Sequence, residues 1–307
     1  MNINHSITEK VRLPILGGEP FCFDIKRDDL IDPIVSGNKW RKLKYNVLKA
    51  KERKQNGILT FGGAFSNHLV ATAKVTHLNG MNSIGIVRGD ELHENSNATL
   101  KMCVEYGMRL IFITRSAYKQ RDDKSFLNEL QTRYPHYFVV PEGGKNYYGV
   151  IGCQEILNET DNNYDHIYLA GGTGTTAAGV LLSTPSCSEI HVVSALKGAF
   201  LTTDIEQQVQ NVLFDSELTA EYMSRLKVHE NAHFGGYGKV TDELFNFMNA
   251  IFEKTGVKTE PIYTGKTLYQ LHKDIQEKRI NRKDKVLFIH TGGLQGAVSW
   301  KDQLDFL

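Results

Sequence analysis

The sequence predicts an α/β protein of two domains, with open, twisted, mainly parallel sheets covered by helices. Short apolar segments alternate with helical segments along most of the chain, which is the pattern of parallel strands joined by right-handed crossovers. Several of these strand segments end in glycine-rich turns. The chain has 307 residues, 41% of them hydrophobic, so it can form a large core in one large or two moderate domains.

The first half of the chain shows the alternation most clearly. We expect strands at residues 21–26, 57–63, 83–87, 109–113 and 137–140. Helices are expected between them, at residues 38–54, 69–78, 97–106 and 125–134. Pro141-Glu142-Gly143-Gly144 ends this block. We therefore predict a small α/β domain at residues 43–148, and a large domain formed by residues 1–42 and 149–307.

The second half continues the pattern with longer connections. We expect strands at residues 166–170, 189–194 and 285–290. The helices expected here span residues 152–157, 177–182, 203–214, 241–255 and 268–277. In an open α/β sheet, ligands bind beyond the carboxyl ends of the strands. The glycine-rich turns at such ends therefore predict one shared site.

Composition excludes several classes of protein. The formal net charge is +1, which indicates no nucleic-acid or membrane-surface partner. The four cysteines lack CxxC spacing, and we see no histidine–carboxylate pairing typical of a metal, so no metal site and no disulfide framework are expected. We find neither a signal-peptide pattern nor an apolar run of membrane-spanning length. These features favour a cytoplasmic protein.

Two stretches carry chemistry. Residues 36–45 pass from a Ser36-Gly37-Asn38 turn into a helix start that bears Lys39 and three further basic residues. Alone, this stretch also fits a solvated basic helix. The strand at 166–170 runs into Gly171-Gly172-Thr173-Gly174-Thr175-Thr176. Glycine N–H groups, hydroxyls and a following helix start form a phosphate cradle, although a purely structural turn is an equal alternative. The turn lacks P-loop and GxGxxG spacing.

The glycine-rich turns occur in an order that resembles a known family. The ordered motifs are Gly37-Asn38-Lys39, Ser66-Asn67-His68, Pro141-Glu142-Gly143-Gly144, the Gly/Thr turn, Tyr237-Gly238, Pro261-Ile262-Tyr263-Thr264-Gly265-Lys266 and His290-Thr291-Gly292-Gly293. They resemble the D-cysteine desulfhydrase and 1-aminocyclopropane-1-carboxylate (ACC) deaminase family. That family belongs to the fold type II pyridoxal phosphate (PLP) enzymes, which share the tryptophan synthase β-subunit architecture. The resemblance spans almost the whole chain and implies PLP as cofactor, a small amino-acid substrate and a homodimer.

The resemblance implies a role for each matching position. Lys39 matches the lysine that forms a Schiff base with the cofactor. The other cofactor contacts it implies are Asn67, Gly172, Thr173, Gly174, Thr175, Thr176, Tyr263 and Thr291. Besides Lys39, the catalytic positions it implies are Ser66, Tyr237 and Tyr263. Substrate contacts are expected from Ser66, Asn67, His68 and Thr264. Residues 66–68 open a helix, and the N-terminus of a helix suits a carboxylate.

Two positions bear on the reaction. The ACC deaminase branch resembles Tyr-Glu and His-Leu where this chain has Tyr263-Thr264 and His290-Thr291, the pattern of the desulfhydrase branch. We therefore favour β-elimination from D-cysteine, or a related small D-amino acid, to pyruvate, ammonia and sulfide. ACC deamination and a non-catalytic binding protein with this fold are the alternatives.

Some positions depart from the family pattern or compete for a role. Ser36 stands where the family commonly has glycine, Trp40 where it has a smaller residue, and Glu260 where it has aspartate. Lys197 and Lys266 are two further lysines near glycine-rich turns, and we expect both to be solvated or structural.

Overall fold

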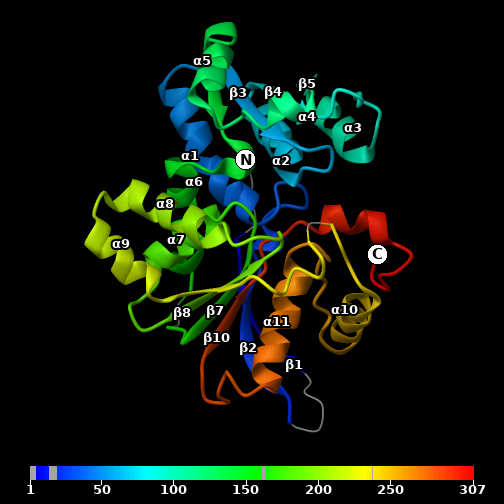
Figure 1. The fold of residues 1–307 in the computed structure, drawn as a ribbon. Helices are drawn as coiled ribbons and strands as arrows, with labels where there is room; N and C mark the ends of the chain where they lie inside the picture. Colours follow the sequence, from blue (N-terminus) through cyan, green and yellow to red (C-terminus); the bar gives the residue numbers. More distant parts are fainter. Residues whose placement is uncertain (1–4, 14–18, 161–162, 237) are drawn as a thin grey trace.

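The computed structural model describes residues 5–13, 19–160, 163–236 and 238–307, and it shows two parallel-type sheets with helices around them (Figure 1). One sheet has six strands and the other has four. The expected α/β class with mainly parallel sheets is therefore confirmed. Within these residues, no helix combines the length and the apolar character needed to cross a membrane.

The six-stranded sheet forms the lower part of the molecule in Figure 1. Its strands, in spatial order, are β1 (Thr8–Leu13), β2 (Phe21–Lys26), β10 (Val286–Ile289), β7 (His166–Gly171), β8 (Glu189–Ser194) and β9 (Leu226–His229). Only the β1–β2 pair is antiparallel among these neighbours. The carboxyl ends of β7, β8 and β10 therefore lie at one edge of the sheet, where the Gly/Thr turn begins.

Side chains that alternate along these strands bury both faces of the sheet. Ile167 and Leu169 of β7 pack into one core, and Tyr168 between them packs into the other. The first core is shared with α6 (Tyr147–Asn158), α7 (Thr175–Ser183), α8 (Leu201–Leu213) and α9 (Ser216–Met223). The second is shared with α10 (Asp242–Thr255) and α11 (Thr264–Gln276). The apolar residues of β7 thus form a nearly continuous run, as in a strand buried on both faces.

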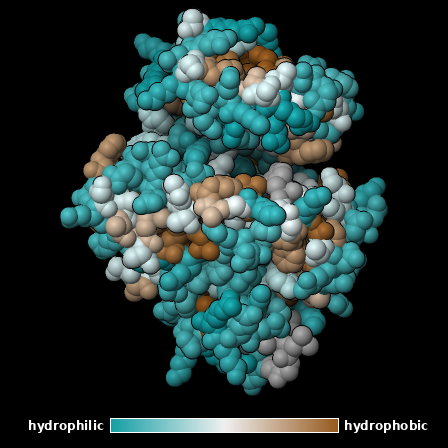
Figure 2. Space-filling model, viewed as in Figure 1, coloured by the Kyte–Doolittle hydropathy of each residue, from teal (hydrophilic) through white to brown (hydrophobic). Residues whose placement is uncertain are grey.

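The four-stranded sheet is entirely parallel and lies at the top of Figure 1. Its order is β5 (Met108–Ile113), β4 (Asn82–Arg88), β3 (Gly57–Gly62) and β6 (Tyr137–Val140). The helices in this part are α1 (Asn38–Glu52), α2 (Asn67–Leu78), α3 (Ala98–Glu105), α4 (Arg115–Tyr118) and α5 (Lys124–Arg133). Three 3₁₀ helices complete the structure: η1 (Asp28–Leu30), η2 (Glu142–Gly144) and, near the end of the chain, η3 (Leu294–Trp300). Figure 2 shows a hollow in the surface between this part and the six-stranded part.

Most predicted elements are present, with some differences. The segments β1, α4, α9 and β9 were not predicted as elements, and α6 and α11 begin earlier than expected, at Tyr147 and Thr264. The strand β9 alternates apolar and polar residues, but its four residues are too short a pattern to predict a strand. The division into domains at 1–42 plus 149–307 and 43–148 stays a prediction. The candidate Tyr237 lies outside the described residues.

Candidate active site

Two turns from distant parts of the chain interlock at the start of α1. The backbone of Gly37 has φ of 61°, and an added Cβ there would lie 1.9 Å from the carbonyl oxygen of Thr291. The same carbonyl accepts a hydrogen bond from Asn38 N at 3.2 Å. Gly293 N donates to Ser36 Oγ at 3.3 Å. The turn after β10 therefore fixes where α1 begins, and Ser36 contributes a hydroxyl that glycine would lack.

Lys39 lies in the first turn of α1, and its amine contacts Asn38 at the start of the same helix. Its Nζ donates to Asn38 Oδ1 at 2.5 Å, and Asn38 Nδ2 donates to Thr176 Oγ1 of α7 at 2.9 Å. Burial and the positive charge of Lys42 together lower the pKa of the Lys39 amine to about 7. A large fraction of this amine is therefore neutral near pH 7, as a base or nucleophile requires.

Lys42 is a site residue that the sequence analysis did not single out. It lies three residues after Lys39, on the same face of α1, and only 5% of it is exposed. Burial lowers its pKa, while the thiol of Cys153 nearby raises it slightly. A buried lysine beside a half-buried one, with little opposing charge, is unfavourable unless an anion lies near them. The two-lysine spacing in the basic stretch was the signal for this.

His68 is buried beside the two lysines, in the first turn of α2. Burial and the charges of Lys42 and Lys39 together lower its pKa to about 3, so the ring is neutral. Thr60 Oγ1 donates to the carbonyl of Val140 at 2.8 Å, so His68 Nε2 must donate to that hydroxyl oxygen at 3.0 Å. Nδ1 is then an acceptor, and it is buried with no hydrogen-bond partner in the described structure. The site thus has an unused acceptor next to two amines.

The Gly/Thr turn forms the opposite wall, at the carboxyl end of β7. Gly174 adopts a left-handed conformation (φ 76°) at the N-cap of α7, and no side chain caps the helix. Gln208 Nε2 holds the turn by donating to the carbonyl of Thr173 at 2.8 Å. The hydroxyls of Thr173 and Thr175 lie 3.1 Å apart. Uncapped N–H groups, a helix dipole and hydroxyl donors make this an anion site.

Ser66 and Asn67 reach the site from the carboxyl end of β3. Ser66 is the N-cap of α2, and its hydroxyl accepts from Leu69 N at 3.3 Å. Asn67 Nδ2 lies 3.4 Å from where a Cβ on Gly293 would be, so Asn67 packs on the turn after β10. Both side chains are half-buried. The structure therefore brings these two predicted residues to the same turn that positions α1.

Tyr263 and Thr264 begin α11 on the far side of the Gly/Thr turn. The Tyr263 ring lies 3.3 Å from where a Cβ on Gly172 would be, so any side chain larger than glycine would press on this ring. Thr264 is fully buried, and its hydroxyl accepts from Glu260 N at 2.9 Å. Glu260 also accepts from Tyr263 N and Thr264 N. The Thr264 hydroxyl is therefore already hydrogen-bonded within the turn that begins at Glu260.

The remaining candidate residues either lie at the site or hold the surrounding structure in place. Thr291 is buried next to Asn38, whose N–H its carbonyl accepts. Lys266 is only 1% exposed and donates to the carbonyls of His233 and Gly236, at 2.8 and 3.1 Å, so it is structural, as expected. Lys197 is exposed, also as expected. His290 donates from Nε2 to the carbonyl of Lys258 at 2.7 Å and accepts from Gly292 N, which makes it a structural hydrogen-bonder.

These features match the needs of one cofactor. A phosphate suits the uncapped start of α7 near the buried Lys42, an aldehyde suits the Lys39 amine with its lowered pKa, and a flat ring suits the side of Tyr263. The fold and the site together define a PLP-dependent enzyme of fold type II. In agreement, residues 4–292 match the family described as pyridoxal-phosphate dependent enzymes.

Similar proteins define the family more closely. A mitochondrial protein of Arabidopsis thaliana named bifunctional D-cysteine desulfhydrase/ACC deaminase is 30% identical over 302 residues, covering 91% of this chain and 74% of the relative. A solved ACC deaminase homologue superposes with a TM-score of 0.78 at 23% identity, covering 97% of this chain and 92% of that structure. The chain belongs to the ACC deaminase and D-cysteine desulfhydrase family of PLP enzymes.

The same fold supports other chemistry in more distant proteins. A PLP-dependent aspartate racemase superposes with a TM-score of 0.66 at 15% identity, covering 95% of this chain and 91% of that structure. A hydrogen sulfide-producing enzyme from Fusobacterium nucleatum gives a TM-score of 0.67 at 15% identity, covering 96% and 97%. At such identities the likeness shows the fold alone, so the reaction must be argued from the residues of this site.

Proposed function

We propose that the protein catalyses PLP-dependent β-elimination from D-cysteine or a related small D-amino acid. The overall reaction consumes one water and converts D-cysteine to pyruvate, ammonia and hydrogen sulfide. The observation that carries the choice of substrate is the pair Thr264 and Thr291, which have the desulfhydrase pattern. Both side chains are buried, with Thr264 at the start of α11 and Thr291 in the turn that holds α1.

The protein supplies the base. Bound PLP supplies an aldehyde that holds the substrate amino group and a conjugated ring that accepts the electrons of the α-carbon. Lys39 removes the α-proton, because its pKa of about 7 leaves much of the amine neutral near pH 7. Asn38 accepts from Lys39 Nζ and ties it to Thr176, which limits the positions the amine can take. The bond from the β-carbon to sulfur then breaks, and the thiolate leaves.

Other residues hold the reacting groups. The Gly172–Thr176 turn and Lys42 would hold the cofactor phosphate, and Tyr263 would lie against the ring. The start of α2 would bind the substrate carboxylate with its uncapped N–H groups and with the Ser66 proton, since only the oxygen of Ser66 is used in capping. Asn67 would hydrogen-bond the cofactor's 3-oxygen. The roles of Tyr237 and His68 stay predictions.

A substrate comparison tests the proposal directly. Purified holoenzyme is given D-cysteine, L-cysteine and ACC separately, and pyruvate and 2-oxobutyrate are measured. Pyruvate from D-cysteine, with slower or no reaction of the other two, is the expected result. Formation of 2-oxobutyrate from ACC as the faster reaction would favour the alternative, ACC deaminase, an activity that also appears in the name of the Arabidopsis relative.

Exchange of the two threonines tests the residue argument. We expect Thr264→Glu with Thr291→Leu to shift the ratio of D-cysteine to ACC turnover toward ACC by about tenfold or more, the scale of ~1–3 kcal/mol for changed pocket contacts. The new glutamate would lie next to the buried carboxylate of Glu260, so cofactor absorbance must first show an intact site. Thr291→Leu alone is the matched variant without this charge.

An unchanged ratio in a variant that binds PLP would refute the two-residue argument. A wild-type protein that binds PLP and turns over none of the three compounds would favour the remaining alternative, a non-catalytic binding protein. The expected homodimer and cytoplasmic location stay predictions, and sedimentation of the holoenzyme would test the first.

A further inference from the structure

A row of three histidines crosses neighbouring strands of the six-stranded sheet, far from the site described above. His166 begins β7, His191 lies in β8 and His229 ends β9. His166 Nδ1 lies 3.1 Å from His191 Nε2, and His191 Nδ1 lies 3.0 Å from His229 Nε2. Neutral imidazoles can share protons in such a chain, so the row alone indicates no ligand.

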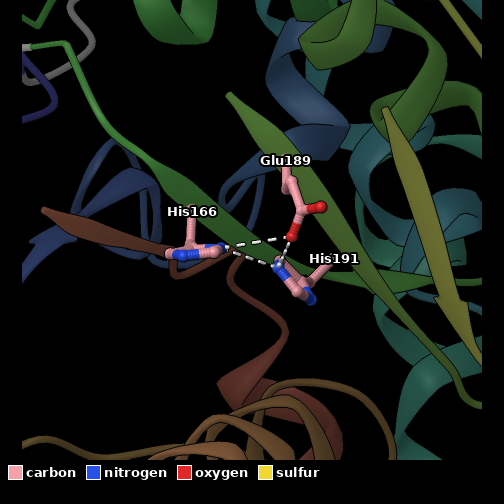
Figure 3. Close-up of side chains that lie close together, drawn as sticks. All are labelled: His166, Glu189 and His191. Carbon is pink, nitrogen blue, oxygen red and sulfur yellow. Dashed lines mark hydrogen bonds and ion pairs between the residues drawn. The ribbon is translucent and has the colours of Figure 1, made fainter. Parts of the chain in front are cut away.

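Glu189 adds a feature that a hydrogen-bonded chain does not explain. Its Oε2 lies 3.6 Å from His166 Nδ1 and 3.7 Å from His191 Nε2, too long for direct hydrogen bonds. The three side chains point toward one another, as Figure 3 shows. Glu189 is the strand neighbour of His166, and His191 follows on the same face of β8 two residues later. Strand pairing therefore brings two histidine nitrogens and one carboxylate oxygen close together.

We propose that His166, Glu189 and His191 bind a divalent transition-metal ion of the Zn²⁺ type. Ligand atoms around a tetrahedral ion with bonds of ~2.0–2.1 Å lie about 3.3 Å apart. The spacing of these residues along the sequence did not indicate a metal site. In the structure, the two histidine nitrogens lie 3.1 Å apart, and the Glu189 oxygen lies 3.6 and 3.7 Å from them. A triangle with those sides has a point about 2 Å from every corner, which matches metal–nitrogen and metal–oxygen bond lengths.

The other nitrogen of each imidazole has a partner suited to a metal ligand. His166 Nε2 lies 3.3 Å from Asp284 Oδ2, so it can donate to a carboxylate while Nδ1 faces the ion. His191 Nδ1 can donate to His229 Nε2 while its own Nε2 faces the ion. Such partners fix the ring orientation and the tautomer of metal-binding histidines. They are present here on both rings.

The His191 ring is also held in place. It stacks on Tyr168, with ring centroids 4.2 Å apart and an interplanar angle of 4°. The other Glu189 oxygen lies 3.8 Å from Lys227, which leaves Oε2 directed at the histidines.

A second trio, His191, His229 and Asp274, is a weaker candidate. The Asp274 carboxylate accepts from Tyr168 at 2.7 Å, and from Gln270 and Arg279 at 2.8 Å each. Its lone pairs are largely used and its charge is already balanced by Arg279. The side chain of Glu189, in contrast, is 45% exposed and lies near the two histidines and a lysine at 3.8 Å, so it can give an oxygen to an ion.

The position indicates a structural ion instead of a catalytic one. His166 and Gly172 lie at opposite ends of β7, about 20 Å apart at ~3.3 Å per residue. An ion here would tie β7 to β8, and through His229 it would support the short edge strand β9. Water can complete the coordination on the exposed side of Glu189. Two nitrogens and one carboxylate oxygen favour Zn²⁺, Co²⁺, Ni²⁺ or Cu²⁺ over Mg²⁺.

Equilibrium dialysis of the holoenzyme tests the site. The protein is treated with a chelator, exchanged into metal-free buffer and dialysed against Zn²⁺, and bound zinc is measured by atomic emission. Glu189→Gln and His166→Ala are the test variants, and Glu206→Gln, an exposed carboxylate of α8 on the other face of the sheet, is the matched control. We expect one Zn²⁺ per chain in the wild type and the control, and at least tenfold weaker binding in both test variants. Asp284→Asn should weaken binding by a smaller factor.

A wild type that binds no zinc would overturn the proposal, as would wild-type zinc affinity in Glu189→Gln and His166→Ala. Thermal unfolding gives a second readout, since an ion that binds only the folded state stabilises it. Zinc should raise the unfolding temperature of the wild type and the control and leave that of the two test variants unchanged. An equal rise in all four proteins would mean that zinc binds elsewhere.

Discussion

The strand β7 has opposite chemistry at its two ends. Its carboxyl end runs into Gly172–Thr176, where uncapped N–H groups, hydroxyls and the nearby Lys39 and Lys42 present positive charge and hydrogen-bond donors. Its amino end, with that of β8, presents the lone pairs of His166, His191 and Glu189. One end suits an anion such as a phosphate, and the other suits a cation.

The two ends are also built from different parts of the protein. At the carboxyl end the donors are mainly backbone groups, which a strand, a glycine turn and a helix start supply in sequence order. At the amino end the ligands are side chains that only strand pairing brings together. The first kind of site is visible along the chain, while the second needs the register of the sheet. Substitutions at either end of β7 test this difference.

Replacement of Lys39 should have the largest effect. We expect Lys39→Ala to lower turnover of D-cysteine by ~10³-fold or more, because it removes both the cofactor attachment and the base. The visible absorbance of the lysine-bound cofactor should disappear with it. Pyruvate formation and the absorption spectrum are the measurements.

The control is Lys51→Ala, an exposed lysine later in α1 that should keep both signals. If the two ends of β7 are independent, Lys39→Ala should also bind zinc as the wild type does, and Glu189→Gln should keep its pyruvate formation. Retained cofactor absorbance in Lys39→Ala would refute the lysine assignment.

The interlocked turns give the next largest effect. Gly37 and Gly80 have similar φ angles, 61° and 64°, but a Cβ on Gly37 would collide with Thr291 O at 1.9 Å, whereas a Cβ on Gly80 would meet nothing within 4 Å. Both alanine variants carry the cost of a left-handed residue, about 1–2 kcal/mol. Only Gly37→Ala must also separate the two turns, which adds about 1–3 kcal/mol.

Urea unfolding of both variants isolates this second contribution. Gly37→Ala should unfold at lower urea than Gly80→Ala, and it should bind PLP more weakly because α1 and Lys39 are displaced. Equal midpoints for the two variants would mean that the turns can separate without cost, and the site would then be less firmly positioned than the structure indicates.

Much of the fold could be predicted from the sequence because its strands are buried on both faces. The apolar run of β7, with the glycine turn and helix that follow, is a local pattern that survives in the structure. The elements that were missed have weaker local patterns. The strand β1 alternates polar and apolar residues at an antiparallel edge, and β9 is four residues long. Their place depends on neighbours that the sequence does not specify locally.

The candidate site shows the same limit. Lys39 and the Gly/Thr turn were predicted, since each lies where a turn meets a helix. Lys42 was missed, although it is one turn further along α1, because a basic helix start is usually solvated, whereas here Lys42 is buried and packs close to Gly144 of η2. The role of Thr264 in substrate binding stays a prediction, and the structure adds a hydrogen bond of its hydroxyl to Glu260 that the sequence did not indicate. Burial and side-chain pairing of this kind depend on tertiary contacts.

The pH dependence of cofactor attachment gives the smallest effect and probes the two-lysine arrangement. Burial and the positive charge of Lys42 together lower the pKa of Lys39 to about 7. Only the neutral amine reacts with an aldehyde, so the rate at which the apoenzyme captures PLP should rise with pH and reach half its maximum near pH 7. An unperturbed lysine would place that midpoint near its usual pKa of 10.5.

Lys42→Met should move this midpoint to higher pH, because it removes the positive charge that disfavours protonation of Lys39. A shift of about one unit corresponds to ~1.4 kcal/mol. In the apoenzyme, the unfolded chain binds more protons than the folded one between pH 7 and 10.5, so Lys39 should also make folding more favourable as pH rises through that window. An unchanged midpoint in Lys42→Met would mean that burial alone sets the Lys39 pKa. Lys42 would then act only in binding the anion.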